Sequence, residues 1–224
     1  MTNRYNNYSD FLKNKYGVKV YKLPISIPVT CPNRDGTCGF DGCSFCGDIG
    51  AGYQHVPDTV GIKEQIAMHK GHIIDKYKAK KFIAYLQNYS NTYLPLATLE
   101  KYLLEACDED VVRIALATRP DCVSDSYLEK LADIKSKMKV DISIELGLQT
   151  VNYHALEEIR RGHSLAEYLD AMQRINKYGL ESCTHVILNL PGSDRLDVIE
   201  TAKVLSAMKT TEAKIHALYI IKGT

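Results

Sequence analysis

The chain has 224 residues, of which 45% are hydrophobic and 25% are charged, and its formal net charge is +1. This length allows one sizeable buried core, and the composition is ordinary for a globular protein. A nearly neutral chain has no global field that attracts nucleic acid, so such binding would need a local patch. No run of 18 apolar residues occurs, which predicts no membrane-spanning helix and no membrane partner.

Residues 1–17 form a polar extension with some helical character, and they precede a core domain that we place at 18–224. The extension lacks the apolar stretch of a secretory signal. Seven cysteines are present, and four of them fall within residues 31–46. An odd number in this arrangement is not a disulfide framework, and it is typical of metal-binding thiols in a reducing cytoplasm. We therefore expect a cytoplasmic protein.

Along the chain, strand-like segments alternate with helix-like segments. The expected strands, which are short and apolar, are 18–29, 80–87, 111–118, 140–148, 180–190 and 213–221. The expected helices are 59–77, 96–107, 124–138, 153–160, 164–178 and 196–209. This alternation predicts an α/β fold with a parallel sheet and right-handed crossovers. It fits either an open doubly wound sheet or part of a (β/α) barrel. No helix follows the last strand, and we expect a longer natural protein.

Capping signals support three of the helix ends. Ser124 stands at an N-cap position before the helix at 125. Ser164 and Glu167 have the spacing of a capping box. Gly179 stands where a glycine would end the helix that begins after Ser164.

Polar residues follow five of the expected strands, at 31–46, 87–93, 118–122, 145–149 and 189–192. In parallel α/β folds the carboxyl ends of the strands meet at one rim, and ligand-binding residues gather there. Folding alone does not require polar side chains from five strands at one rim. The sequence therefore predicts a site at this edge.

The segment after the first strand carries four cysteines: Cys31, Cys38, Cys43 and Cys46. Three thiolates on one short loop suit an iron–sulfur cluster that keeps one iron open. A structural zinc, in contrast, takes four protein ligands. The spacing alone leaves two alternatives open, because Cys38, Cys43 and Cys46 would also make a compact trio and all four could hold zinc.

Several motifs together resemble the radical S-adenosylmethionine (SAM) enzymes, and within them the YhcC/YtqA-like branch, related to the Elp3/MiaB/NifB-type domain. The motifs are Cys31-Pro-Asn-Arg-Asp-Gly-Thr, Cys43-x-Phe-Cys46, Phe82-Ile-Ala-Tyr-Leu-Gln87, Thr118-Arg-Pro-Asp-Cys122, Glu145-Leu-Gly-Leu-Gln149, Arg161-Gly-His163, Leu190-Pro-Gly192 and Lys214-Ile-His216. The resemblance covers nearly the whole chain.

The resemblance implies a partial (β/α)6 TIM-type barrel with parallel strands. It also implies a [4Fe–4S] cluster held by Cys31, Cys43 and Cys46, with the fourth iron chelated by SAM. Cys38 is then an incidental thiol. The reduced cluster of such enzymes cleaves SAM to methionine and a 5′-deoxyadenosyl radical, and a flavodoxin or ferredoxin would supply the electron. The implied substrate is tRNA, with the carboxymethylaminomethyl side chain of the wobble uridine converted to aminomethyl.

The resemblance also suggests residues that contact the cofactors. Phe45 would pack on the adenine or shield the cluster, and Arg161 would clamp the SAM carboxylate, as the fork of a guanidinium permits. Glu145 would face the barrel mouth, since a charge in an apolar strand needs a partner. The further candidates are Gln87, Tyr89, Ser90, Asn91, Gln149, Asn189 and Tyr219. Ordinary loop packing, a helix cap and a salt bridge are the competing explanations for these residues.

Other interpretations remain open at this stage. His185 and His216 lie in strand-like runs, where a core histidine is the simpler explanation. The same enzyme class could act on a peptide or a small metabolite. A zinc-bearing or cluster-bearing binding module without catalysis would require a fourth ligand, for which Cys38 is the nearby candidate.

Overall fold

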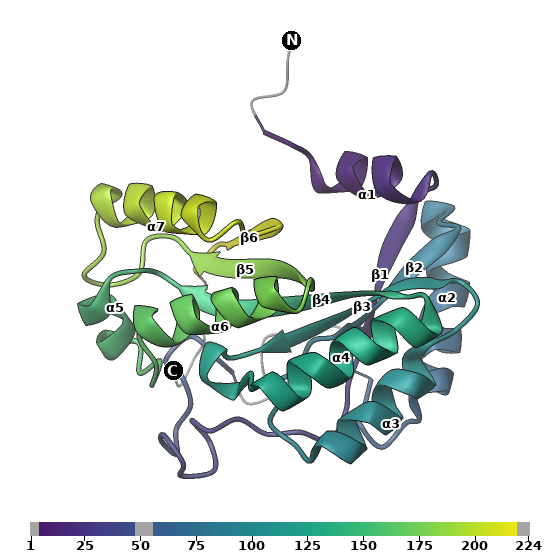
Figure 1. Ribbon diagram of the computed structural model, residues 1–224, viewed down its shortest axis with the longest axis horizontal. Helices are drawn as coiled ribbons and strands as arrows, with labels where there is room; N and C mark the ends of the chain where they lie inside the picture. Colours follow the sequence, from purple (N-terminus) through teal and green to yellow (C-terminus); the bar gives the residue numbers. More distant parts are fainter. Residues whose placement is uncertain (1–4, 48–55, 219–224) are drawn as a thin grey trace.

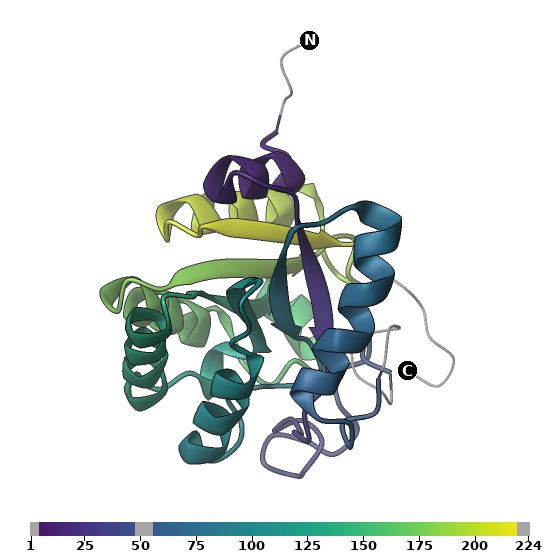
Figure 2. The same cartoon turned by 90° about the vertical axis from the view of Figure 1, so that its right-hand side faces the viewer.

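The computed structural model describes residues 5–47 and 56–218. Six parallel strands form one sheet in the order of the sequence, and the sheet curls into a half-barrel (Figures 1 and 2). The strands are β1 (Val20–Ile25), β2 (Lys81–Leu86), β3 (Val111–Thr118), β4 (Asp141–Gln149), β5 (Glu181–Ile187) and β6 (Glu212–His216). This order is that of a partial (β/α)6 barrel, so the doubly wound alternative is wrong.

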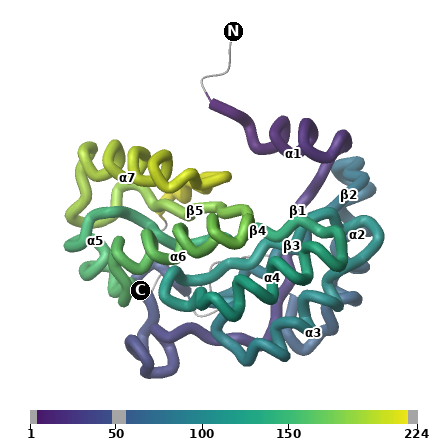
Figure 3. Tube along the Cα trace, viewed as in Figure 1, coloured from purple at the N-terminus to yellow at the C-terminus, as the bar shows by residue number. Residues whose placement is uncertain are grey.

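Helices connect successive strands and lie on the outer side of the curved sheet, as the trace in Figure 3 shows. They are α2 (Ile62–Tyr77), α3 (Leu96–Ala106), α4 (Asp125–Met138), α5 (Tyr153–Glu158), α6 (Leu165–Lys177) and α7 (Arg195–Ala207). Their apolar faces pack against outward-facing strand residues such as Phe82, Leu116 and Ile144 in one continuous core. None of the described helices is long and apolar enough to cross a membrane.

The inner side of the sheet is more polar than the outer side. Side chains alternate along each strand, so Ile83 and Tyr85 face inward while Phe82 and Ala84 join the outer core. Helix α1 (Tyr8–Tyr16) lies over this interior at the amino ends of the strands. Its Leu12 packs with Ile83 and other inner apolar residues. The N-terminal extension thus packs against the core, and its boundary at residue 17 stays a prediction.

Each expected element has a counterpart among the described residues, and the differences concern the ends. β1 is shorter than the expected 18–29, and residues 219–221 of the last expected strand lie outside the described residues. β5 stops at Ile187 rather than 190, because Asn189 takes a left-handed conformation with φ of 61°. The capping box of Ser164 with Glu167 is confirmed. Ser124 is at the N-cap position, but its side chain makes no cap hydrogen bond, since its hydroxyl pairs with the Ser126 hydroxyl.

Candidate active site

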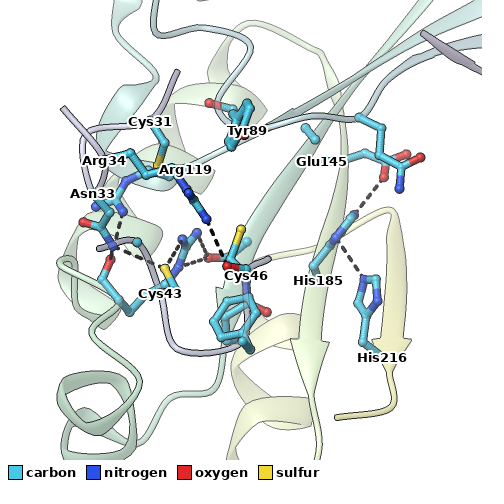
Figure 4. A pocket seen from close by; sticks show the side chains of 18 of the residues that line it. Cys31, Asn33, Arg34, Cys43, Cys46, Tyr89, Arg119, Glu145, His185 and His216 are labelled. Carbon is cyan, nitrogen blue, oxygen red and sulfur yellow. Dashed lines mark hydrogen bonds and ion pairs between the residues drawn. The ribbon is translucent and has the colours of Figure 1, made fainter. Parts of the chain in front are cut away.

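A pocket opens at the carboxyl ends of the strands, inside the half-barrel. Cys31, Cys43 and Cys46 all line it, together with residues from β2 to β6. Cys38 is exposed and does not line the pocket. Figure 4 shows the three sulfurs on one side and Glu145, His185 and His216 on the other. The pocket therefore has a sulfur end and a second, titratable end.

The cysteine loop is fixed by contacts with the turn after α5. The Asn33 amide donates hydrogen bonds to Cys43 Sγ at 3.2 Å and to the carbonyls of Arg160 and Arg161 at 2.8 and 3.1 Å. Gly162 leaves room for this amide, because a Cβ there would lie 2.6 Å from Asn33 Oδ1. Gly162 also has a φ of 70°, which favours glycine. Residues far apart in sequence thus hold the loop in place.

Three arginines surround the sulfur end. Arg34 donates to the carbonyls of Cys46 and Gly47 at 2.9 and 2.8 Å. Arg119 makes a bidentate ion pair with Asp121 at 2.9 and 2.8 Å and is almost fully buried. Arg161 directs Nη1 at Cys43 Sγ, 3.5 Å away. Guanidinium groups stabilise thiolates and the anionic clusters that thiolates form.

Most N–H groups of the Arg161 guanidinium form hydrogen bonds within the protein. Its Nε and Nη2 donate to the Gly147 carbonyl at 3.2 and 2.7 Å, in addition to the contact with Cys43. A Cβ at Gly147 would lie 2.6 Å from Arg161 Nη2, so a larger residue there would displace this guanidinium. This geometry assigns Arg161 to the support of Cys43 and leaves two N–H groups for any ligand. It does not favour the predicted clamp on a carboxylate.

The thiol of Cys46 is in a protected environment. Burial raises its pKa, while the hydrogen bond and charge of Arg34 act in the opposite direction. A metal overcomes this burial effect, since coordination deprotonates a thiol.

The structure brings several of the predicted cofactor residues to the pocket. Those that line it are Phe45, Gln87, Tyr89, Glu145, Gln149 and Arg161. Phe45 also packs on Leu156 and Ile187. Tyr89 lies under the Arg34 guanidinium, with 5.5 Å between Cζ and the ring centroid.

Ser90 and Asn91 do not line the pocket, although the sequence analysis placed them there. Both are fully buried. The Asn91 amide donates to the carbonyls of Leu86, Asn88 and Ala117, and the Ser90 hydroxyl pairs with Thr118. Their polar groups therefore fix the loop after β2. Asn189 lines a separate groove beside α7, and Tyr219 lies outside the described residues.

The backbone conformation of residues at the carboxyl ends of the strands also points to a site there. Tyr89, Gln149 and Asn189 follow β2, β4 and β5 with φ of 51°, 76° and 61°. Left-handed non-glycine residues are uncommon, and they gather at functional sites when the surroundings hold them. Lys78 and Lys139, in contrast, take this conformation at ordinary helix ends.

The second end of the pocket is built around a buried carboxylate. Glu145 accepts from Lys22 Nζ at 2.5 Å and pairs with His185 Nε2 at 2.7 Å. Burial would raise its pKa, but the His185 hydrogen bond and the Lys22 charge outweigh burial and hold the pKa below its usual value. His216 Nε2 lies 3.1 Å from His185 Nδ1. Burial, followed by the charge of His185, lowers the pKa of His216 to about 4.

His185 and His216 were expected to be core histidines. The structure instead places both of them in the lining of the pocket. Lys22, Tyr85 and Lys214 were not among the predicted site residues. A signal for Lys214 exists, because polar residues recur at every second position of β4 and β6. Treating these strands as buried on both faces concealed it.

Comparisons with known proteins identify the class. The model of the Radical SAM superfamily matches residues 26–205, so the chain belongs to this superfamily. It is a radical SAM enzyme, which uses a [4Fe–4S] cluster and SAM. The chain is 36% identical to YtqA of Bacillus subtilis, over 99% of this chain and 68% of that protein. It is 34% identical to YhcC of Escherichia coli, over 98% and 70%.

Similarity to a tRNA-modifying enzyme is weaker and partial. A tRNA uridine(34) acetyltransferase of Methanocaldococcus jannaschii is 26% identical over 54% of this chain and 22% of its own length. Among solved structures, Methanocaldococcus infernus Elp3 aligns with a TM-score of 0.63 at 17% identity, over 92% of this chain and 47% of its own. Escherichia coli HemN aligns with a TM-score of 0.59 at 15% identity, over 96% and 48%. These structures support the half-barrel fold.

The residues present fit the cluster that this class uses. Three sulfurs of one loop line one pocket, cationic side chains surround them, and the exposed Cys38 lies outside. Asn33 and Arg161 direct N–H groups at Cys43 Sγ, as the hydrogen bonds that tune cluster sulfurs do.

Proposed function

We propose that Cys31, Cys43 and Cys46 hold the [4Fe–4S] cluster, and that the enzyme acts on the wobble uridine of tRNA. When bound, the cluster supplies the electron that cleaves SAM. The observation that carries the ligand assignment is the common pocket of these three sulfurs, from which Cys38 is excluded. The protein's part is to support the sulfurs through Asn33 and Arg161 and to exclude water from the enclosed interior.

In this proposal SAM lies beside the sulfur end and contacts pocket residues. Phe45, Gln87, Tyr89 and Gln149 line the same pocket as the three cysteines. Aromatic faces can stack on an adenine, and amide groups can bind the amino and carboxylate groups of an amino acid. In this arrangement the substrate occupies the end around Glu145, and an electron donor such as flavodoxin or ferredoxin supplies the reducing electron in the cytoplasm.

The proposed reaction converts the carboxymethylaminomethyl side chain of uridine 34 to aminomethyl. The C–N bond to the carboxymethyl group breaks, SAM takes up the two electrons of the oxidation as it becomes methionine and 5′-deoxyadenosine, and water releases the two-carbon group as glyoxylate. Its support is the partial similarity to tRNA uridine(34) acetyltransferases, together with the fold shared with Elp3. The net charge of +1 offers no global attraction for tRNA, which also leaves a peptide or a small metabolite as candidate substrates.

Cysteine variants test the ligand assignment. Anaerobic reconstitution of the full chain should give about four irons per chain. Cys43→Ala should lose the cluster and all formation of 5′-deoxyadenosine from SAM and dithionite. Cys38→Ala is the matched control and should retain both. Loss of iron in Cys38→Ala with retention in Cys31→Ala would contradict the assignment.

Nucleoside analysis tests the substrate. tRNA from a strain that lacks the gene should accumulate carboxymethylaminomethyluridine and lose aminomethyluridine. The wild-type gene and Cys38→Ala should restore the aminomethyl nucleoside, and Cys43→Ala should not. An unchanged wobble-uridine profile would remove the tRNA proposal and favour a peptide or metabolite substrate.

A further inference from the structure

The end of the pocket around Glu145 carries more positive than negative charge. Tyr85, Glu145, His185, Lys214 and His216 line the pocket there. Lys22 and Cys183 do not line it, but Lys22 is ion-paired with Glu145 and the Cys183 sulfur lies within 4.8 Å of a Glu145 oxygen. We call these seven residues the basic end, and it holds two ammonium groups and one carboxylate. Glu212 lies two residues before Lys214 on β6, but its carboxylate pairs with Arg113.

The two lysines differ in how they are paired. Lys22 Nζ is hydrogen-bonded to Glu145 at 2.5 Å. Lys214 Nζ contacts the Tyr85 hydroxyl at 3.3 Å and lies 5.0 Å from the Tyr85 ring centroid. Among the described residues no carboxylate lies within 4.0 Å of Lys214 Nζ. A half-buried ammonium has three N–H donors, and here a single long hydrogen bond uses one of them.

The histidines do not supply this missing partner. Because Glu145 accepts from His185 Nε2–H, His185 Nδ1 is the acceptor for the Nε2–H of His216. The chain of hydrogen bonds thus runs toward Glu145, whose two oxygens contact Lys22 and His185. Lys214 lines the pocket, and among the described residues its printed hydrogen bond is the one to Tyr85.

A cation is a poor candidate for this end. Glu145, Cys183 and His185 have ligand atoms within 4.8 Å of one another, which could suit a metal ion. However, Lys22 already occupies one Glu145 oxygen, and Lys214 adds a second positive charge nearby. The ammonium groups of Lys22 and Lys214 would repel a metal cation in this low-dielectric interior, and they therefore oppose metal binding.

We propose that Lys214 and the basic end form a subsite that binds one carboxylate group of the substrate. One excess positive charge matches a monoanion, and a carboxylate can accept both unused N–H groups of Lys214. This inference rests on the proposed function, because it places the substrate at the end opposite the sulfurs. It restricts the substrate class to molecules that carry a carboxylate near the reacting group.

A binding measurement tests the subsite without turnover. The probe is sodium acetate, with acetamide and sodium chloride at the same ionic strength as references. Acetate should raise the unfolding midpoint of the full chain by a few degrees, and the references should not. Lys214→Met should lose this response, whereas Lys214→Arg should keep it. The matched control Lys203→Met removes an exposed lysine, paired with Glu200, and should respond like wild type.

The unliganded variants add a readout that a merely structural lysine would not give. Removing an ammonium that lacks a carboxylate partner relieves a desolvation cost. Lys214→Met without acetate should therefore unfold at the same midpoint as wild type or at a higher one. An equal response to acetate in wild type and Lys214→Met, or the same response to acetamide as to acetate, would overturn the inference.

A substrate comparison separates this inference from the proposed function. Wild type should prefer tRNA with the carboxymethylaminomethyl group over its primary amide by about tenfold to a hundredfold in kcat/KM. Lys214→Met should lose that preference, and an unchanged preference would overturn the inference. Wild type that turns over neither tRNA, while keeping a Lys214-dependent response to acetate, would contradict the tRNA proposal and support the carboxylate subsite.

Discussion

The two ends of the barrel interior are both rich in charge, and they differ in how completely that charge is paired. At the amino ends of the strands, beneath α1, lies a group that we call the closed end. Its members are Lys15, Tyr16, Arg113, Asp141, Glu181 and Glu212. Arg113 pairs with Glu212 and, at 2.7 Å, with Glu181. Lys15 pairs with Asp141 at 2.9 Å and also with Glu181.

The same strands supply both ends, a few residues apart. β4 contributes Asp141 to the closed end and Glu145 to the basic end. β6 contributes Glu212 to the closed end and Lys214 to the basic end. Every charge of the closed end lies within 4.0 Å of an opposite charge, with two cations shared among three carboxylates, and α1 covers the group. At the basic end no carboxylate of the described residues lies within 4.0 Å of Lys214 Nζ, and Lys214 lines the pocket. Complete pairing is what a structural group requires, whereas an unpaired charge in a pocket is available to a ligand.

The largest expected effect is on stability, at the closed end. Arg113→Met removes a cation whose side chain is 1% exposed, and it leaves Glu212 without its ion-pair partner and Glu181 with Lys15 alone. Breaking a buried ion pair from one side costs about 3–5 kcal/mol in the free energy of unfolding. Urea denaturation measures this loss. Activity per folded molecule should stay close to wild type, since Arg113 does not line the pocket.

A second substitution sharpens this test. Glu212→Gln in the Arg113→Met background removes the carboxylate that the first substitution leaves uncompensated, and it should recover part of the lost stability. If Arg113→Met unfolded with the wild-type midpoint, or if the double variant were less stable than the single one, the closed end would not be held by pairing.

A smaller loss of stability is expected at the basic end. Glu145→Gln removes the carboxylate that Lys22 and His185 share. Lys22 is partly exposed and can take up water, so the expected cost is about 1–3 kcal/mol, less than for Arg113→Met. Product formation should fall, because the orientation of His185 is no longer fixed by a charge. The response to acetate should increase, since the excess positive charge grows.

Glu200→Gln is the matched control for this variant, because Glu200 forms an exposed pair with Lys203. It should leave stability and activity unchanged. A Glu145→Gln protein that bound acetate more weakly than wild type would contradict the charge count of the basic end.

The fold could be predicted from the sequence to a large extent, because each strand is a short apolar run between amphipathic helices. β3 begins and ends where the pattern places it. The choice between an open sheet and a barrel could not be made from the pattern, since strand order depends on how successive crossovers pack. The resemblance to the family supplied that choice.

The sulfur end was also readable, since its ligand candidates are neighbours in sequence. At the basic end Glu145 was predicted as a site residue, and Lys22, His185 and Lys214 were not. These three come from three other strands and approach Glu145 only when the sheet curls. The contacts of Ser90, Asn91 and Arg161 within the protein could not be read from the sequence for a related reason. Asn91 and Arg161 donate to backbone carbonyls and to Cys43, and Ser90 pairs with Thr118, which no local pattern shows.

The smallest and most gradual effect is the response of the two ends to acid. Burial lowers the pKa of His216 to about 4 and lowers the pKa of His185, with Glu145 opposing the shift at His185. Burial and the Arg161 charge likewise lower the pKa of His163 to about 3. A group with a lowered pKa binds more protons when unfolded, so its contribution to stability is present above the ordinary pKa and is lost as pH falls.

For the histidines this loss begins near pH 6.5, the ordinary value, and runs for His216 to about 4. At the closed end, burial raises the pKa of Asp141, but the hydrogen bond from Lys15 lowers it by more. The pKa of Asp141 is therefore lowered from its ordinary value of 3.8. Its contribution is therefore lost only in stronger acid. Urea midpoints measured against pH should fall first over the histidine range. His216→Asn should make that fall shallower and leave the loss below pH 3.8 unchanged, whereas Asp141→Asn should do the reverse. Equal slopes in all three proteins between pH 6.5 and 4 would mean that the two ends do not titrate separately.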